Sequence, residues 1–308
     1  MRYLKIGLLA VIGLLFLAVA GLIAFDWLSQ PREPDNQVFI TEAAQYHVRI
    51  KRDNFGVPHV FGKTDPDVAF GFAFAHCEDE FATIQQVTIA TRGHLAAIEG
   101  RKAAVTDYLV HLLGVWDTVD KKYDRELPAY LKDVLNAYAD GVNYYAALHP
   151  DKVARGLLPL TGRDIAAGFV FKTPFFYGLD RELRKLTEPA PATVPQGSNG
   201  VAISPLRAAD GATRLLVNSH QPYAGPVAWY EAVLQSEEGW HVAGGFFPGS
   251  PFMLHGHNAQ LGWANTVNSP DLVDVYRLKI NPANKDQYLL DGKWRDFEKK
   301  DAAIRVKL

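Results

Sequence analysis

The stretch "TVPQGSNGVAIS" (residues 193–204) decides how the chain is divided. Proline and turn-forming residues end at Gly197-Ser198-Asn199, and within two residues the sequence becomes apolar and strand-like. The simplest interpretation is a surface turn before a strand, because Gly and Asn readily adopt turn conformations. The residues on either side of this stretch decide whether it is more than a turn.

The overall composition is that of a globular protein. Of 308 residues, 48% are hydrophobic and 21% are charged, so the chain can bury a substantial core. Lys and Arg (32 together) nearly balance Asp and Glu (34 together), so nothing in the charge suggests a nucleic-acid partner. Cys77 is the single cysteine, which excludes an intramolecular disulfide and a thiolate metal cluster.

The N-terminal residues are typical of a targeting segment. Arg2 and Lys5 precede an apolar run over 6–25, and a helix of about 20 residues spans the hydrocarbon layer. A signal peptide has a shorter apolar region, and the small residues at 18–20 that would suit cleavage lie inside the run. We therefore expect residues 1–27 to be a signal or anchor, preferably an uncleaved inner-membrane anchor, with the remainder in the periplasm.

Periodicity changes along the chain. Residues 28–186 are mainly helical, with apolar residues at helical spacing from Asp65, from near Asp124, and over 161–186, where Pro174 predicts a kink or break. Residues 187–197 are a proline-rich spacer without periodicity. From 198 to 308, short runs rich in Val, Leu, Tyr and Trp alternate with turn residues and predict strands. The expected fold class is α+β.

Five stretches occur in an order that is informative as a set. Before the spacer these are "RDNFGVPHVFGKTDPDVAFGFAFAHCEDEF" (52–81) and "TRGHLAAIEG" (91–100). After it come "GSN" (197–199), "NSHQPY" (218–223) and "GGFFPGSPFMLHGHNAQLGWANTVNSPDLVDVY" (244–276). In this order the chain resembles the penicillin-acylase-like N-terminal-nucleophile (Ntn) hydrolases. The resemblance is closest to acylases of acyl-homoserine lactones and acylated cyclic peptides.

The resemblance implies an αββα sandwich formed by a helical α-chain region and a strand-rich β-chain. Family members carry a much longer second chain, so we expect this sequence to be C-terminally truncated and to hold an incomplete sandwich. Residues 198–308 would be the N-terminal part of the β-chain. The family forms an α/β heterodimer from one precursor, which implies autocatalytic cutting between Gly197 and Ser198.

The proposed cut has a clear chemical purpose. A serine hydroxyl needs a base, and an α-amine with a pKa near 8 exists only at a chain start. Cutting before Ser198 therefore places nucleophile and base in one residue. Gly197 suits the processing step, because a residue without Cβ leaves its carbonyl open to attack.

Further site residues follow from the resemblance. His220 would orient the amine of Ser198 and favours long aliphatic acyl amides over phenylacetyl β-lactams. The backbone N–H of Val267 would be an oxyanion donor. Phe246 and Phe247 are core residues or line an apolar acyl pocket. The histidines of "HGH" (255–257) fall in a turn motif that the family uses structurally.

A metal site is expected only at Asp271 and Asp274, which match calcium-binding positions of some penicillin acylases. Two carboxylates are a thin set for calcium, which prefers six or more oxygens, so capping or salt-bridge roles are the alternative. No cofactor is required for the expected chemistry.

The leading hypothesis is a self-processing amidohydrolase that cleaves the acyl amide bond of acyl-homoserine lactones or acylated peptides. Its substrate would be a small molecule, and the bond cleaved would be a carbon–nitrogen bond of a linear amide other than a peptide bond, as in quorum quenching or antibiotic metabolism. One alternative is an acylase of β-lactam side chains, and another is an inactive membrane-anchored remnant.

Overall fold

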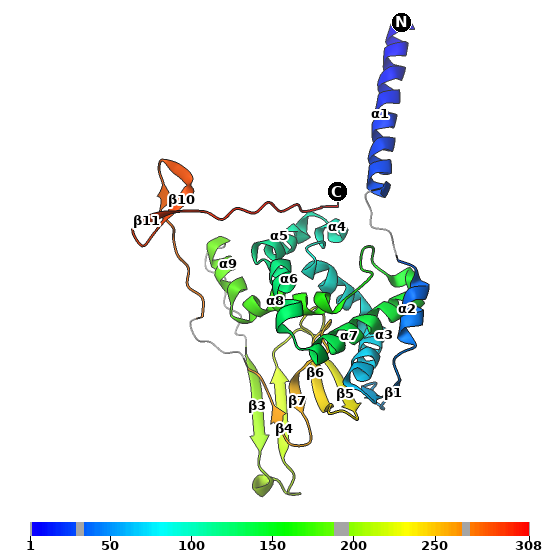
Figure 1. The fold of residues 1–308 in the computed structure, drawn as a ribbon, viewed down its shortest axis with the longest axis vertical. Coiled ribbons are helices and arrows are strands. Elements are labelled where there is room, and N and C mark those ends of the chain that lie inside the picture. The colour runs from blue at the N-terminus through cyan, green and yellow to red at the C-terminus, as the bar shows by residue number, and fades with distance from the viewer. Residues whose placement is uncertain (1, 29–33, 188–196, 267–271, 308) are drawn as a thin grey trace. The chain divides into compact units, whose positions relative to one another are not determined.

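The computed structural model describes residues 2–28, 34–187, 197–266 and 272–307. It divides into two units, Met1–Asp35 and Asn36–Leu308. The first contains helix α1 (Arg2–Leu28; Figure 1). Among the described residues, none of the helices combines the length and the apolar character that a membrane span requires.

The second unit contains the remaining elements. Its helices are α2 (Asn36–Ala43), α3 (Asp65–Thr91), α4 (Ala96–Glu99), α5 (Ala104–Leu112), α6 (Val115–Glu126), α7 (Ala129–Leu148), α8 (Gly162–Phe176) and α9 (Leu179–Thr187). Its strands are β1 (Val48–Arg52), β2 (Pro58–Gly62), β3 (Ser198–Ile203), β4 (Arg214–Ser219), β5 (Tyr230–Ser236), β6 (His241–Phe246), β7 (Met253–His257), β8 (Gly262–Trp263), β9 (Ile280–Asn281), β10 (Asn284–Leu290) and β11 (Lys293–Asp296).

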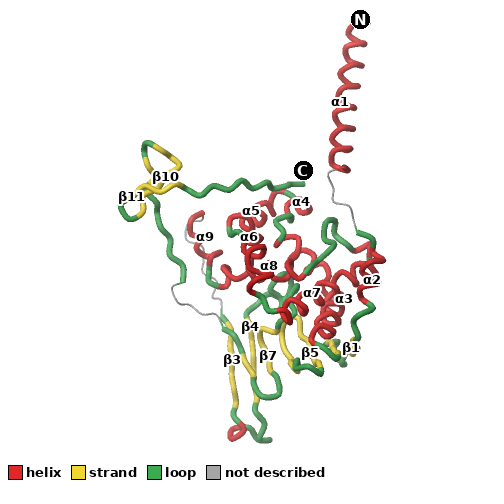
Figure 2. The backbone as a smooth tube through the Cα atoms, in the orientation of Figure 1, coloured by secondary structure: helices red, strands yellow, loops and turns green. Residues whose placement is uncertain are grey.

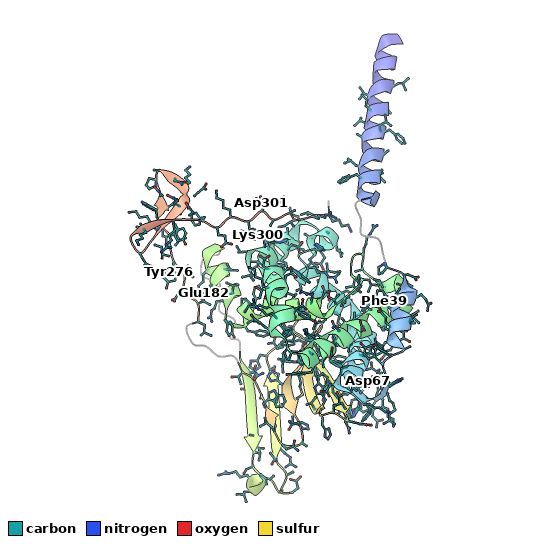
Figure 3. The ribbon with its side chains drawn as sticks, in the orientation of Figure 1. Phe39, Asp67, Glu182, Tyr276, Lys300 and Asp301 are labelled. Carbon is teal, nitrogen blue, oxygen red and sulfur yellow. The ribbon has the colours of Figure 1, made fainter. Side chains whose placement is uncertain are left out.

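Helix α3 starts where its sequence supplies a cap. The Thr64 hydroxyl accepts from the Asp67 N–H at 3.1 Å, and the Asp67 carboxylate accepts from the Thr64 N–H at 3.2 Å. Asp67, labelled in Figure 3, also accepts from the backbone N–H of His47 at 2.8 Å. The helix predicted from Asp65 is confirmed, with a non-helical residue at Glu80 inside it.

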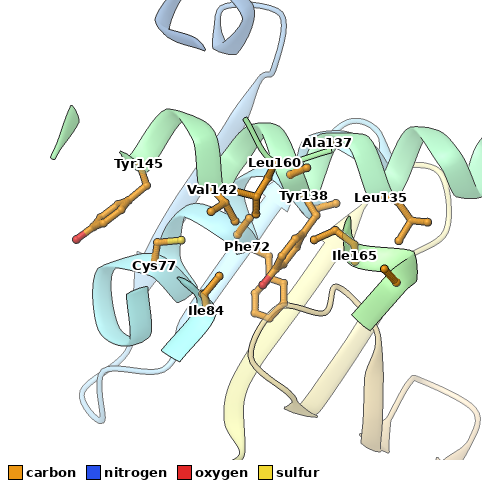
Figure 4. Packing of buried hydrophobic residues seen from close by; sticks show 14 of the residues in the cluster. Phe72, Cys77, Ile84, Leu135, Ala137, Tyr138, Val142, Tyr145, Leu160 and Ile165 are labelled. Atoms are coloured by element: carbon orange, nitrogen blue, oxygen red, sulfur yellow. The ribbon is translucent and has the colours of Figure 1, made fainter. Parts of the chain in front are cut away.

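The core is centred on the contact between α3 and α7. Phe72 and Ile84 of α3 and Tyr138 and Val142 of α7 are fully buried in one cluster (Figure 4). Gly141 permits the close approach, because a Cβ there would lie 2.4 Å from the carbonyl oxygen of Phe70. The apolar periodicity of both segments therefore reflects burial against each other.

Two of the predicted helical regions are each divided into two helices. The helix expected from near Asp124 is divided, because Pro128 is an extended N-cap between α6 and α7. In the region 161–186, α8 contains Pro174, ends at Phe176, and is followed by α9 after a left-handed Gly178 (φ 88°). The predicted break is confirmed at that point.

The largest sheet joins segments from both sides of the spacer. Its order is β1-β2-β5-β6-β7-β8, and β2 and β5 are its only parallel neighbours in the described chain. Figure 2 colours the strands yellow, with β1, β5 and β7 of this sheet labelled. Helix α3 packs on β1, β2 and β5. Val60 of β2 faces Leu234 of β5 in register, and both are fully buried. The segments before and after residue 197 therefore share one core.

Two smaller sheets complete the described strands. Strands β3 and β4 form an antiparallel pair, and β9, β10 and β11 form another sheet. The strand expected over residues 271–281 is present only as Ile280–Asn281 within the described part. The mixture of helices and sheets confirms the expected α+β class. The spacer residues 188–196 lie outside the described residues.

Candidate active site

Ser198 is the first residue of strand β3. It pairs with Ser219 of β4, and the register continues to Ile203 opposite Arg214. One step beyond this pairing, the backbone N–H of His220 donates to the carbonyl oxygen of Gly197 at 3.3 Å. The Gly197-Ser198 peptide bond is therefore held at the end of a regular strand pair.

The Gly197 carbonyl has two donors. Besides the His220 N–H, the Ser198 hydroxyl donates to the same oxygen at 2.7 Å. A backbone donor on a carbonyl oxygen would stabilise the negative charge that develops there during attack on the carbon. At 3.3 Å this bond is long for an N–H donor and would have to shorten to act strongly.

The His220 ring lies against the same peptide. Its Nε2 is 3.3 Å from the side-chain Nδ2 of Asn199. Because an amide NH₂ can only donate, Nε2 accepts, and the neutral ring carries its proton on Nδ1. A Cβ built on Gly197 would lie 3.5 Å from that Nδ1. The structure thus brings Gly197, Ser198 and His220 together, and their catalytic roles stay predictions.

The space around Gly197 does not by itself require a glycine, and its role in processing stays a prediction. A Cβ there would meet only ordinary van der Waals neighbours, the nearest at 3.5 Å. Gly197 is also not among the glycines with positive φ in the described chain. An alanine would therefore fit the uncut conformation without a clash.

A second histidine contacts Ser219, the residue that pairs with Ser198, and sequence reasoning assigned it only a structural role. His255 of β7 is 7% exposed, and its Nε2 is 2.9 Å from the Ser219 hydroxyl. Its Nδ1 accepts from the backbone N–H of Asn265 at 2.9 Å. Burial lowers the pKa of His255, which favours a neutral ring. A histidine on one strand opposite a serine on another leaves no local sequence signal.

The two phenylalanines expected in an acyl pocket have different surroundings. Phe246 is fully buried, with its ring centroid 4.6 Å from that of Phe72 in the core, so a packing role replaces the expected substrate contact. Phe247 stacks on Trp229 at 4.3 Å, and Trp229 meets His255 edge to face at 4.4 Å. An aromatic cluster therefore adjoins the histidine that contacts Ser219.

The remaining expected site residues are Val267, Asp271 and Asp274. Val267 and Asp271 lie outside the described residues. Asp274 is exposed, and within the described ranges no three His, Cys, Asp or Glu side chains gather in a group suited to a metal ion. The calcium site at Asp271 and Asp274 therefore stays a prediction.

A surface hollow of about 570 Å³ lies elsewhere, lined by Arg52, Phe55, Gly56, Glu78 and Asp79. The Arg52 guanidinium donates to Glu78 at 2.9 Å and to Asp79 at 2.8 Å, so one cation is shared by two carboxylates. None of its lining residues belongs to β3 or β4. The hollow is thus unrelated to the chemistry at Ser198.

Comparison with known proteins adds the family. Residues 47–308 match the family described as Penicillin amidase. Similar curated proteins include the acyl-homoserine lactone acylase PvdQ of Pseudomonas fluorescens, 27% identical over 297 residues that cover 84% of this chain and 38% of the relative. The PvdQ of Pseudomonas syringae pv. tomato is 25% identical over 300 residues, with 84% and 38% covered.

A solved thermostable penicillin G acylase from Alcaligenes faecalis aligns with a TM-score of 0.33 and 20% identity, covering 48% of this chain and 97% of that one. The chain spans 38% of the length of the first curated relatives it matches. The family match, in contrast, takes in both β1–β2 and the strands after Ser198. The chain belongs to the penicillin amidase family.

Proposed function

We propose that this protein is a self-processing amidohydrolase with Ser198 as its nucleophile. The observation that carries the proposal is the Gly197 carbonyl oxygen, which accepts from both the Ser198 hydroxyl and the His220 N–H. Membership of the penicillin amidase family supports amide hydrolysis as the reaction class.

Processing would begin at the Gly197-Ser198 peptide bond. The Ser198 Oγ loses its proton and attacks the Gly197 carbonyl carbon, and the oxyanion forms where the His220 N–H already donates. The C–N bond then breaks, its nitrogen takes a proton, and Gly197 is left as an ester on Oγ. Water hydrolyses this ester, giving a carboxylate at Gly197 and a free amine at Ser198.

Hydrolysis of substrate would use the residue that processing frees. The α-amine of Ser198 takes the proton from Oγ, which attacks the acyl carbonyl of the substrate. The amide C–N bond breaks, the amine product leaves with a proton, and water releases the acyl group from Oγ. His220 would orient the amine through its ring, and the Val267 N–H would complete the oxyanion site.

The two products of the cut are expected to remain one particle. Strand β2 lies before the cut and β5 after it, and they pair from His59 opposite Val233 to Gly62 opposite Ser236. Separating them would expose buried residues of both strands to water. We propose an α/β heterodimer, which size-exclusion chromatography of cut protein would show as one peak containing both pieces.

The proposed substrate is a small N-acyl compound with an apolar acyl chain. The curated relatives are named acyl-homoserine lactone acylases, and partly exposed Trp229, which stacks on buried Phe247, offers apolar contact near the site. Release of lactone from long-chain acyl-homoserine lactones is expected to exceed release of phenylacetate from a penicillin. The reverse preference would favour the β-lactam alternative.

We also propose that the protein is exported to the periplasm. The basic residues Arg2 and Lys5 followed by the apolar run 6–25 support export. Cell fractionation tests this, and a cytoplasmic location would contradict it.

The processing proposal is tested by paired serine variants. Ser198→Ala removes the attacking hydroxyl and should leave a single uncut chain. Ser204→Ala is the matched control, since Ser204 is an exposed serine just after the same strand. Cutting of Ser198→Ala protein at the same site would show that another group attacks, and the proposal would fail. Purified wild type that is never cut and never active would favour the inactive alternative.

A further inference from the structure

His255 bridges two segments that meet at Ser198's strand pair. Its Nδ1 is 2.9 Å from the backbone N–H of Asn265, which can only donate. The neutral ring therefore carries its proton on Nε2 and donates it to the Ser219 hydroxyl, 2.9 Å away. Because Nε2 is the donor, His255 cannot take a proton from Ser219. The pair is thus not a second serine nucleophile with its base.

The positions of Ser219 and Asn265 in the chain show which parts of the site His255 connects. Ser219 faces Ser198 in the register of β3 and β4 and directly precedes His220. Asn265 comes two residues before Val267, the expected oxyanion donor, in the sequence. One buried ring therefore ties the strand end that holds the nucleophile to the segment that leads toward the oxyanion donor.

The backbone that carries the His255 ring is packed tightly against strand β6. Gly256 follows His255 with φ 145°, and a Cβ there would lie 2.2 Å from the carbonyl oxygen of Ala243. Gly244, which faces Gly256, has equally little room, since its Cβ would lie 2.0 Å from the His255 carbonyl oxygen. Strands β6 and β7 thus approach too closely for side chains. With Trp229 against its ring in an edge-to-face contact, His255 has a fixed position.

We propose that His255 is a positioning residue for the Ser198 site. It acts through Ser219 and Asn265, setting the position of the nucleophile relative to the oxyanion donors, and it does not touch the reacting atoms. This inference rests on the proposed function of Ser198. Misplacement of reacting groups by about 1 Å can lower a rate by about 10²-fold, so the effect is expected in rates more than in substrate binding.

Three substitutions separate the two hydrogen bonds. His255→Asn places an acceptor near the Nδ1 position and can retain the Asn265 bond, whereas His255→Gln places a donor near Nε2 and can retain the Ser219 bond. His255→Leu retains neither. Cutting rate and kcat should fall about 10²-fold in His255→Leu and by about tenfold in the other two, with KM little changed. His257→Asn, an exposed histidine on the same strand, is the control.

A double-mutant cycle with Ser219→Ala tests the pathway. If His255 acts through Ser219, the two losses should not add in the His255→Asn background, where the Ser219 bond is already lost, whereas they should add in His255→Gln, which retains that bond. Rates of His255→Leu equal to those of His257→Asn would overturn the inference. A raised KM with unchanged kcat would also overturn it, because His255 would then line the substrate pocket.

Nitrogen-15 NMR of the imidazole distinguishes this inference from the proposed function. The inference requires Nε2–H with Nδ1 as acceptor, and an Nδ1–H tautomer would overturn it whether or not the protein is cut. Protein that is never cut but shows Nε2–H would refute the self-processing proposal and leave both His255 bonds standing. Melting curves of His255→Asn and His255→Gln confirm that each variant is folded when its rates are measured.

Discussion

Arg92 should be among the most sensitive residues of the fold. It caps the C-terminus of α3, and its guanidinium donates to Asp164 at 2.6 Å and to the carbonyl oxygens of Gly156, Leu157 and Pro159 at 2.7–2.9 Å. The side chains of Arg92 and Asp164 are only 16% and 5% exposed. This one side chain therefore satisfies a buried carboxylate and three carbonyl groups.

Arg92→Met removes the cation and keeps most of the apolar stem. Asp164 then retains its bonds from Thr161 but loses its charged partner while still buried. Breaking a buried pair by removing one partner destabilises by about 3–5 kcal/mol. Each kcal/mol moves the melting midpoint of a chain this size by about 2–4 °C, so a fall of roughly 10 °C is expected.

Urea unfolding measures this free energy. Arg92→Met and its control, Arg163→Met, are both made in Ser198→Ala protein, so that a single uncut chain unfolds. Trp116, whose Nε1–H donates to the Thr91 carbonyl at 3.0 Å, provides fluorescence near the substitution. The matched control is Arg163→Met, because Arg163 pairs with exposed Asp120 and Asp124 and such pairs contribute about 1 kcal/mol or less. If both variants lose the same small free energy, the account of Arg92 is wrong.

Three further predictions concern other residues. Gly141→Ala should lower the free energy of unfolding by about 1–3 kcal/mol because its Cβ meets backbone, whereas Gly168→Ala, with open space around it, should not. Burial lowers the pKa of Lys172 from 10.5 to about 8, so between those values the unfolded state binds more protons and stability rises with pH. Lys172→Met should remove that rise between pH 8 and pH 10, and an unchanged slope would contradict the prediction. Gly197→Ala should still be cut, as gels would show, because its Cβ has room.

Local sequence signals were sufficient to predict the elements whose ends are set by their own residues. Thr64 and Thr161 each begin a helix through a capping box, and both helices follow an apolar period that is buried in the core. The change to strand at Ser198 is likewise local, because turn residues precede an apolar alternation there.

Features that depend on distant partners left no such signal. Helices α4, α5 and α6 are short, and they are stabilised by burying residues such as Val110, Val115 and Val119 in the common core. The parallel pairing of β2 with β5 joins segments far apart in the chain. Sequence reasoning also could not separate Phe246 from Phe247, since only the strand pairing decides which of them enters the core.

The candidate site likewise combines residues that the sequence predicted with contacts that it did not. Gly197, Ser198 and His220 were expected together, and the pairing of β3 with β4 brings them together. His255 was assigned a structural role, because its contacts with Ser219 and Asn265 form only when β7 lies beside the end of β4. The space around Gly197 could not be predicted either, because the nearest neighbour of a Cβ there is the ring of His220. Room around a residue depends on neighbours that the local sequence does not show.

The central claim is that Ser198 becomes a chain start through its own hydroxyl. Intact-mass spectrometry with N-terminal sequencing of the purified protein tests this claim most directly. The account predicts two pieces whose masses together exceed that of the uncut chain by one water molecule, the second beginning Ser-Asn-Gly-Val-Ala-Ile. A single uncut chain, or a cut at another bond, would contradict it.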